Sequence, residues 1–246
     1  MPASLRAVLV LAALACFSAE AAAPKKAAAI TLFSSGKPGA MPAGWVPLTF
    51  GAHKRPTEYI LSEEDNRIVL HAHSERASSG LIHPARIDVR NMPILQWQWK
   101  ISHVLADADN QVVGKEDSPV RIVLAFDGDK SRLASKDKRA SALVKSVTGR
   151  DLPYAQLVYF WSPRLPVGMV FPHPHSERTQ MVVATSGSAQ AGRWVTLSRN
   201  VVEDFRRAFG EAPGPLIEVG VLTDTDDTGS TVDAWYGDIR FAPGKR

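Results

Sequence analysis

Apolar and polar residues alternate along much of the chain, which is the pattern of strands that bury one face. The clearest case is residues 94–101, where Leu95, Trp97, Trp99 and Ile101 share one face. Two glutamines and a lysine occupy the positions between them. This stretch is predicted to be a half-buried antiparallel strand whose tryptophans lie in the core.

Residues 119–126 repeat this alternation, with Arg121 opposite the apolar face. Other short apolar stretches, separated by glycine and proline turns, predict further strands at 30–34, 45–50, 67–73, 156–161, 169–171, 179–185 and 194–198, and a strand-turn-strand unit at 217–241. Regular short strands of this kind are typical of a sandwich of two sheets. The predicted fold is therefore all-β, a jelly-roll-like antiparallel β-sandwich with two short helices.

The two helices are predicted from a change of period. Residues 130–149 carry apolar residues at helical spacing among lysines, which indicates an inserted amphipathic helix. The second helix is better marked, because Asn200 can cap it, Glu203 completes a capping box, and Gly210 can end it.

The N-terminus has the features of an export signal. Arg6 precedes an apolar run at 7–17, and Ala19-Glu20-Ala21 then offers the small-x-small pattern that a signal peptidase needs. Residues 1–21 are therefore predicted to be a cleaved signal peptide, followed by a linker at 22–27. The remaining residues, 28–243, are predicted to form one β-sandwich domain in a periplasmic or secreted protein.

The one cysteine, Cys16, lies inside this leader, so the mature chain cannot form an internal disulfide. A lipoprotein, acylated at Cys16, is the alternative interpretation of the same leader. No later segment approaches the roughly 20 apolar residues of a transmembrane helix. The net charge of +4 comes from scattered lysines and arginines, which argues against nucleic acid as a partner.

The most polar stretch is the turn at 224–230, where Asp224, Asp226 and Asp227 stand among hydroxyl residues and a glycine. Carboxylate and hydroxyl oxygens are calcium ligands, so calcium at these three aspartates is one interpretation, and no other cofactor is expected. The turn is not an EF-hand loop, because Trp235 stands where a bidentate glutamate is needed. The alternatives are a hydrogen-bonded structural turn and a ligand-binding or catalytic site.

Arg121 is expected to reach the carboxylates of this turn and to hold the last strand in register. The functional alternative is a pocket in which Arg121, Asp117 and Asp224 bind a sugar or an acidic group. Exposed aromatic rings beside such a pocket would stack on sugars. The candidate ligand-binding residues are Arg121, Asp117, Tyr159, Trp161, Asp224, Asp226, Thr228 and Tyr236.

Two His-x-His pairs, His71 with His73 and His173 with His175, each place two imidazoles on one side of an extended chain. Such a pair suits zinc or copper, but a third histidine or a carboxylate must converge on it.

Three C-terminal segments carry a resemblance to a known family: residues 204–210, 222–229 and 234–241. With residues 95–99 and 117–126, they look like a family of exported bacterial proteins known only as a domain of unknown function. The resemblance implies a sandwich of the galactose-binding type, in which a last strand containing Asp-Ile-x-Phe returns beside the first strand.

The predicted function is a non-catalytic binding module for carbohydrate or cell-envelope glycan. The first alternative is a polysaccharide hydrolase or lyase that uses carboxylates of the 224–227 turn. The second is an envelope assembly or scaffolding protein. A catalytic activity is not favoured, because the chain has no Gly-x-Ser-x-Gly elbow and no glycine-rich phosphate loop.

Overall fold

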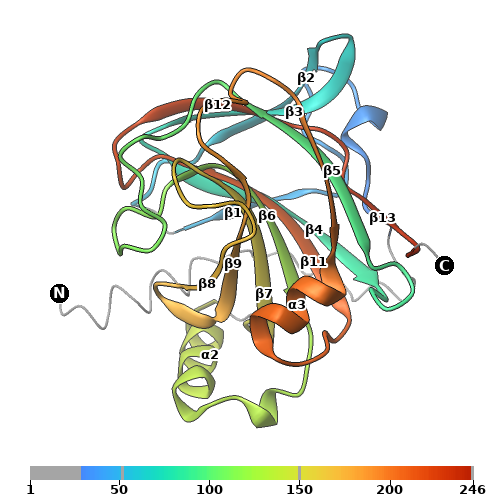
Figure 1. Ribbon diagram of the computed structural model, residues 1–246, viewed down its shortest axis with the longest axis vertical. Coiled ribbons are helices and arrows are strands. Elements are labelled where there is room, and N and C mark those ends of the chain that lie inside the picture. Colours follow the sequence, from blue (N-terminus) through green and yellow to red (C-terminus); the bar gives the residue numbers. More distant parts are fainter. Residues whose placement is uncertain (1–28, 51–52, 149–150, 245–246) are drawn as a thin grey trace.

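Two packed sheets form the protein, and the computed structural model describes residues 29–50, 53–148 and 151–244 (Figure 1). In spatial order, the larger sheet contains β1 (Val46–Thr49), β4 (Ser78–Ile87), β11 (Leu216–Asp224), β6 (Ser118–Phe126), β7 (Ala155–Ser162), β9 (Ser176–Ser186) and β8 (Val170–His173). The smaller sheet contains β10 (Val195–Asn200), β5 (Ile94–Ile101), β12 (Thr231–Tyr236), β3 (Arg67–Glu75) and β2 (Glu58–Glu64), with β13 (Arg240–Ala242) also paired to β5. The β-sandwich fold is confirmed, whereas the predicted leader, the linker and Cys16 lie outside the described residues.

Neighbouring strands are antiparallel except for β7 and β9, which run parallel. The chain leaves β7 and reaches β9 only after forming β8 at the sheet edge, so β9 enters in the direction of β7. This parallel pair departs from the predicted all-antiparallel arrangement.

The main core lies between the two sheets and is rich in aromatic residues. Trp97 and Trp99 on β5 are at most 2% exposed, as their alternation predicts. Trp97 packs against Tyr159, and Trp99 lies near Trp161, both from the larger sheet. The rings of one sheet therefore interdigitate with those of the other, which fixes their relative position.

The two sheets differ in how their outer faces are covered. Every residue of β6 and β7 is buried, because a second apolar cluster covers the outer side of the larger sheet. Phe160, Phe171 and Met181 belong to that cluster, and Leu165 packs against it. Strands β5, β10 and β12 instead alternate between more and less buried residues, so the outer face of the smaller sheet is open to solvent.

Two α-helices occur in the described residues, α2 (Ser135–Thr148) and α3 (Val201–Phe209), preceded by short 3₁₀ turns at η1 (Phe33–Ser35) and η2 (Lys130–Arg132). The Asn200 side chain accepts hydrogen bonds from the N–H groups of Val202 and Glu203, which confirms the predicted cap. Gly210 ends α3 in the left-handed region, with a φ of 72°. Figure 1 shows both helices on the side of the molecule away from β2 and β12.

The predicted strand at 30–34 is wrong, because this segment contains η1 and no strand. The last strand also differs from what the resemblance implies, since β13 pairs with β5 rather than with β1. The N-terminal segment still meets the end of the chain through Ser34, whose N–H donates to Asp238 at 2.9 Å. None of the described helices is long and apolar enough to span a bilayer.

Candidate functional site

The acidic turn after β11 is anchored by a buried ion pair, as predicted. Arg121 Nη1 lies 2.5 Å from Asp224 Oδ2, and the backbone N–H of Ser118 donates to Asp224 Oδ1 at 2.8 Å. Arg121 Nη2 also donates to the carbonyl of Glu116. Only 6% of Arg121 is exposed, so the pair is shielded from water and ties β6 to the end of β11.

Asp117, directly before β6, organises the turn itself. Its carboxylate accepts hydrogen bonds from the N–H and the hydroxyl of Thr228, at 2.7 and 2.6 Å, and from the N–H of Asp227 at 3.3 Å. Asp117 is fully buried. Both Asp117 and Thr228 therefore belong to a hydrogen-bonded structural turn, which is one of the alternatives that the sequence leaves open.

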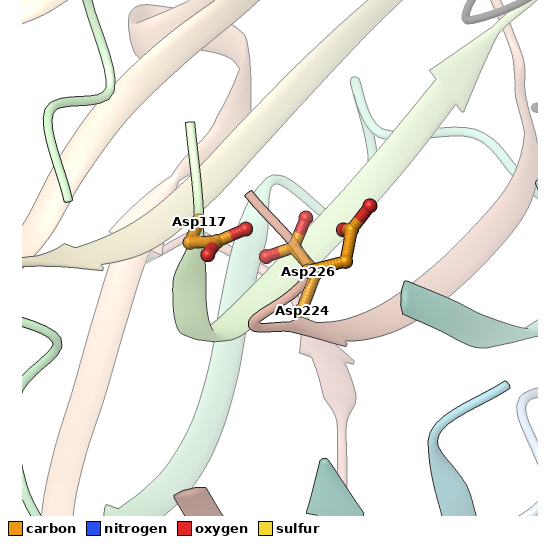
Figure 2. A group of neighbouring side chains, drawn as sticks. All are labelled: Asp117, Asp224 and Asp226. Carbon is orange, nitrogen blue, oxygen red and sulfur yellow. The ribbon is translucent and has the colours of Figure 1, made fainter. Parts of the chain in front are cut away.

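Three carboxylates meet at this corner, as Figure 2 shows for Asp117, Asp224 and Asp226. One oxygen of each lies within 4.8 Å of the others, a spacing that a cation would accept. Each carboxylate nevertheless has a protein partner, because Lys54 Nζ lies 2.6 Å from Asp226 Oδ2 and Arg121 holds Asp224. The donors present thus compensate the charge that calcium would otherwise balance, and calcium at Asp224, Asp226 and Asp227 stays an untested interpretation of the sequence.

Burial raises the pKa of Asp224 to about 7, although the Arg121 guanidinium acts in the opposite direction. The Nε atom of Arg121 is itself buried without a hydrogen-bond partner. Asp224 is consequently a buried carboxyl of this corner that changes its protonation near pH 7.

A second carboxyl pair adjoins the corner. Burial and a hydrogen bond to Glu116 raise the pKa of Asp227 to about 7. Burial acts to raise the pKa of Glu116 as well, but hydrogen bonds from His175 and from backbone N–H groups outweigh it and lower that pKa. His175 Nε2 lies 2.8 Å from Glu116 Oε1. Of the two carboxyls, Asp227 is therefore the one that takes up a proton more readily.

His175 also lines a hollow of about 610 Å³ between α2 and the β8–β9 hairpin. Gln111, Lys136, Phe171 and His173 border the same hollow. Burial lowers the pKa of His173 to about 4, so this imidazole is neutral at pH 7. The hollow is thus linked to the acidic corner through His175 and Glu116.

The aromatic residues proposed as ligand contacts are instead in the core. Tyr159, Trp161 and Tyr236 are each 0% exposed. Their polar atoms are bonded internally, to Asp204, to the Gly187 carbonyl and to the Leu222 carbonyl respectively. No face of these rings is available to a ligand, which corrects the expectation drawn from the sequence.

Accessible aromatic groups occur on the outer face of the smaller sheet. We call this surface the platform and define it by Arg67, His71, His73, Lys100, Trp194, Asp233 and Trp235. The register pairs Trp235 on β12 with His71 on β3 and with Lys100 on β5. The same register pairs Asp233 with His73, so these side chains form neighbouring rows across the strands.

Four of the six tryptophans are buried in the core, whereas Trp194 and Trp235 are half-buried and lie on the platform. The Arg67 guanidinium lies 4.5 Å from the ring centre of Trp194, and Lys100 Nζ lies 5.2 Å from that of Trp235. Asp65 connects the two, because it accepts from Trp194 Nε1 at 2.8 Å and lies 3.4 Å from Lys100 Nζ. Indoles, cations and carboxylates therefore share one solvent-facing surface.

Sequence reasoning identified the acidic corner and the His71–His73 pair, but it did not bring that pair together with Trp194 and Trp235 on one surface. The alternation of β12 was a usable signal, since Val232, Ala234 and Tyr236 face the core and leave Asp233 and Trp235 outward. No comparable signal marks Trp194, which precedes β10 and reaches the platform through its contacts with Arg67 and Asp65.

The fold and these sites define a two-sheet β-sandwich with a buried acidic corner and one open, aromatic sheet face. The chain belongs to a family described as a protein of unknown function, DUF3047, whose model matches residues 43–240. No curated protein sequence gives a significant match.

Among solved structures, the chain is similar to the xyloglucanase domain of NopAA from Sinorhizobium fredii, with 8% identity over 90% of this chain and 100% of that one, at a TM-score of 0.42. It is similar to endoglucanase 3 of Trichoderma harzianum, with 9% identity over 92% and 100% of the two chains and a TM-score of 0.40. It is also similar to a family 30 carbohydrate-binding module of Clostridium thermocellum, with 10% identity over 90% and 96% and a TM-score of 0.35. These likenesses assign no ligand to this chain.

Proposed function

We propose that this protein is a non-catalytic binding module whose platform takes a carbohydrate. The observation that carries the proposal is the position of Trp194 and Trp235, the two tryptophans outside the core, on one open sheet face. An indole offers an apolar surface to a sugar ring, and the surrounding polar groups can bond its hydroxyls. Binding of small ligands commonly combines apolar contact with a few well-placed polar groups.

The spacing of the two indoles favours an elongated ligand. Trp235 lies on β12, and Trp194 directly precedes β10, which is two strands away across β5. Adjacent strands are about 4.8 Å apart, so the two positions are separated by about 10 Å across the sheet. An oligosaccharide that crosses the strands can contact both rings, whereas a monosaccharide cannot.

The proposal also assigns a role to Arg67 and Lys100, whose cationic groups lie over the indole rings. Arg67 and Lys100 have long side chains that are held by Gln98 and by Glu64, at 2.6 and 2.5 Å. Sugar binding moves these side chains off the indole faces and gives their N–H groups hydroxyl acceptors instead. If the predicted leader exports the protein, a glycan of the cell envelope is the ligand that it meets.

The alternative of a hydrolase that uses the 224–227 turn has less support. Asp117 is fully buried, and Arg121 and Ser118 occupy the carboxylate of Asp224. A general acid and base must contact substrate or a water beside it, and these groups contact protein. The corner therefore supports stability more than chemistry, and envelope scaffolding remains a third proposal that the same binding test addresses.

The test is binding of the purified protein to a panel of soluble oligosaccharides and insoluble polysaccharides, measured by calorimetry and by sedimentation. We expect Trp194→Ala and Trp235→Ala each to weaken binding at least about tenfold, because each removes one stacking surface. Val167→Ala is the matched control, since Val167 is 62% exposed and lies outside the platform. Unchanged binding in both tryptophan variants, with melting temperatures like that of the parent, refutes the platform as the glycan site.

A further inference from the structure

His71, His73 and Asp233 form a compact group on the platform that the proposed sugar contacts do not require. His71 Nε2 and His73 Nδ1 each lie 2.9 Å from the same oxygen, Asp233 Oδ1. The three side chains are 26%, 39% and 37% exposed. The carboxylate that a His-x-His pair needs as a third ligand is therefore supplied by the neighbouring strand.

The backbone and one ring hold this group in place. The Asp233 N–H donates to Ser102 Oγ at 3.1 Å, and its carbonyl accepts from the Ser102 N–H at 2.8 Å. The His71 ring stacks on Trp235, with ring centres 5.2 Å apart and an angle of 18° between the planes. The backbone of Asp233 and the ring of His71 are thus held by contacts other than the hydrogen bonds between the three side chains.

The surrounding charge also favours a cation. Glu58 faces His73 across β2 and β3, and Glu75, which pairs with Arg55 at 2.9 Å, follows two residues after His73 on the same side of β3. The nearest platform lysine, Lys100, is already paired with Glu64. Among the described residues, no lysine or arginine forms a salt bridge with Asp233.

We propose that His71, His73 and Asp233 bind a divalent transition metal of the zinc class, with Glu58 or water completing its coordination. Two imidazoles and one carboxylate are a common ligand set for zinc, and a solvent-facing fourth position remains. The present arrangement is one of hydrogen bonding, so the rings must close on the ion, which part-exposed side chains achieve by rotation.

Metal binding requires a change in which ring nitrogen of each histidine carries the proton. Each imidazole directs an N–H at Asp233 Oδ1, and an imidazole that is neutral moves that proton through solvent to its other ring nitrogen on binding the metal. The lone pairs of His71 Nε2 and His73 Nδ1 then face the metal, and Asp233 coordinates as a carboxylate. An imidazole that is charged beforehand releases one proton to solvent, so affinity falls as pH is lowered.

The experiment is titration of Zn²⁺ into the untagged, metal-free protein by calorimetry, with no glycan present. We expect one ion per chain, and at least about tenfold weaker binding in His71→Gln, His73→Gln and Asp233→Asn, since even outer-sphere partners of a metal are worth that much. His53→Gln is the matched control, because His53 is exposed and lies outside the platform. The visible spectrum of bound Co²⁺ reports the coordination number independently.

Absence of Zn²⁺ binding, or equal affinity in parent, His73→Gln and Asp233→Asn, overturns the metal site. Loss of binding in His53→Gln to the same extent overturns it too, because the effect would then be unrelated to these ligands. Melting curves of the metal-free variants establish that they are folded. Because the titration contains no sugar, its outcome is separate from that of the glycan proposal.

Discussion

Replacing Arg121 with methionine tests the buried ion pair most directly. Methionine fills much of the arginine volume but donates no hydrogen bond, so Asp224 and the Glu116 carbonyl both lose a partner. At pH 5 Asp224 is largely protonated, because burial raises its pKa to about 7. At this pH the variant mainly loses the hydrogen bonds of the charged Arg121 guanidinium, which lowers the free energy of unfolding by about 1.5 to 3 kcal/mol.

At pH 8 the cost is larger, because Arg121 is what favours the ionised form of Asp224. Without the guanidinium the pKa of Asp224 rises further, and the variant must either bury an unpaired carboxylate or take up a proton. Each pH unit above the parental pKa adds up to about 1.4 kcal/mol. We therefore expect a loss of about 3 to 4 kcal/mol at pH 8, in the range known for breaking a buried pair.

The assay is urea unfolding followed by tryptophan fluorescence at pH 5 and at pH 8. When Asp224→Asn is already present, Arg121→Met should cost the same free energy of unfolding at both pH values, since no carboxyl is left to titrate at this position. Arg90→Met is the control, because Arg90 is exposed and pairs only with exposed Asp88. A loss below 1 kcal/mol at pH 8, or an equal loss at both pH values, refutes the reasoning.

Two further predictions concern the same corner. The folded-state pKa values of Asp224 and Asp227 are raised from 3.8 to about 7, so both contribute stability that is present at low pH and is lost between about pH 4 and 7. Asp227→Asn should therefore flatten the pH dependence of the free energy of unfolding in this window. A steeper dependence in this variant would contradict the prediction. Because Lys54 and Arg121 already pair with the acidic turn, we expect millimolar calcium to leave the melting temperature unchanged. If calcium raises the melting temperature and Asp226→Asn abolishes that rise, the turn is an ion site instead.

Local patterns predicted those elements whose residues have one buried face and clear end signals. Strand β5 spans the predicted residues because alternation is visible on both of its faces. Helix α3 likewise begins after Asn200 and ends before Gly210, as capping requires. The parallel pairing of β7 with β9 was not predictable in this way, because it depends on β8 taking the sheet edge.

The difference between strands with one buried face and strands with two also explains which residues of the candidate site were predicted correctly. Arg121 and Asp224 were predictable partners, since a lone arginine in an apolar strand needs a counter-charge and the acidic turn supplies one. Two of the three misplaced aromatic residues, Tyr159 and Trp161, lie on β7, where every residue is buried. A strand covered on both faces gives no periodic signal that separates core from surface, so its aromatics look the same as ligand contacts.

The coverage of the two sheets therefore decides where recognition can occur. The larger sheet lies between the main core and a second apolar cluster, and its polar corner is bonded to itself through Arg121, Asp117 and Thr228. The smaller sheet has the main core on only one side, so polar and aromatic residues at alternate positions face water. Because a side chain held by core packing cannot also stack on a ligand, Trp194 and Trp235 are the two indoles whose position leaves them open to one.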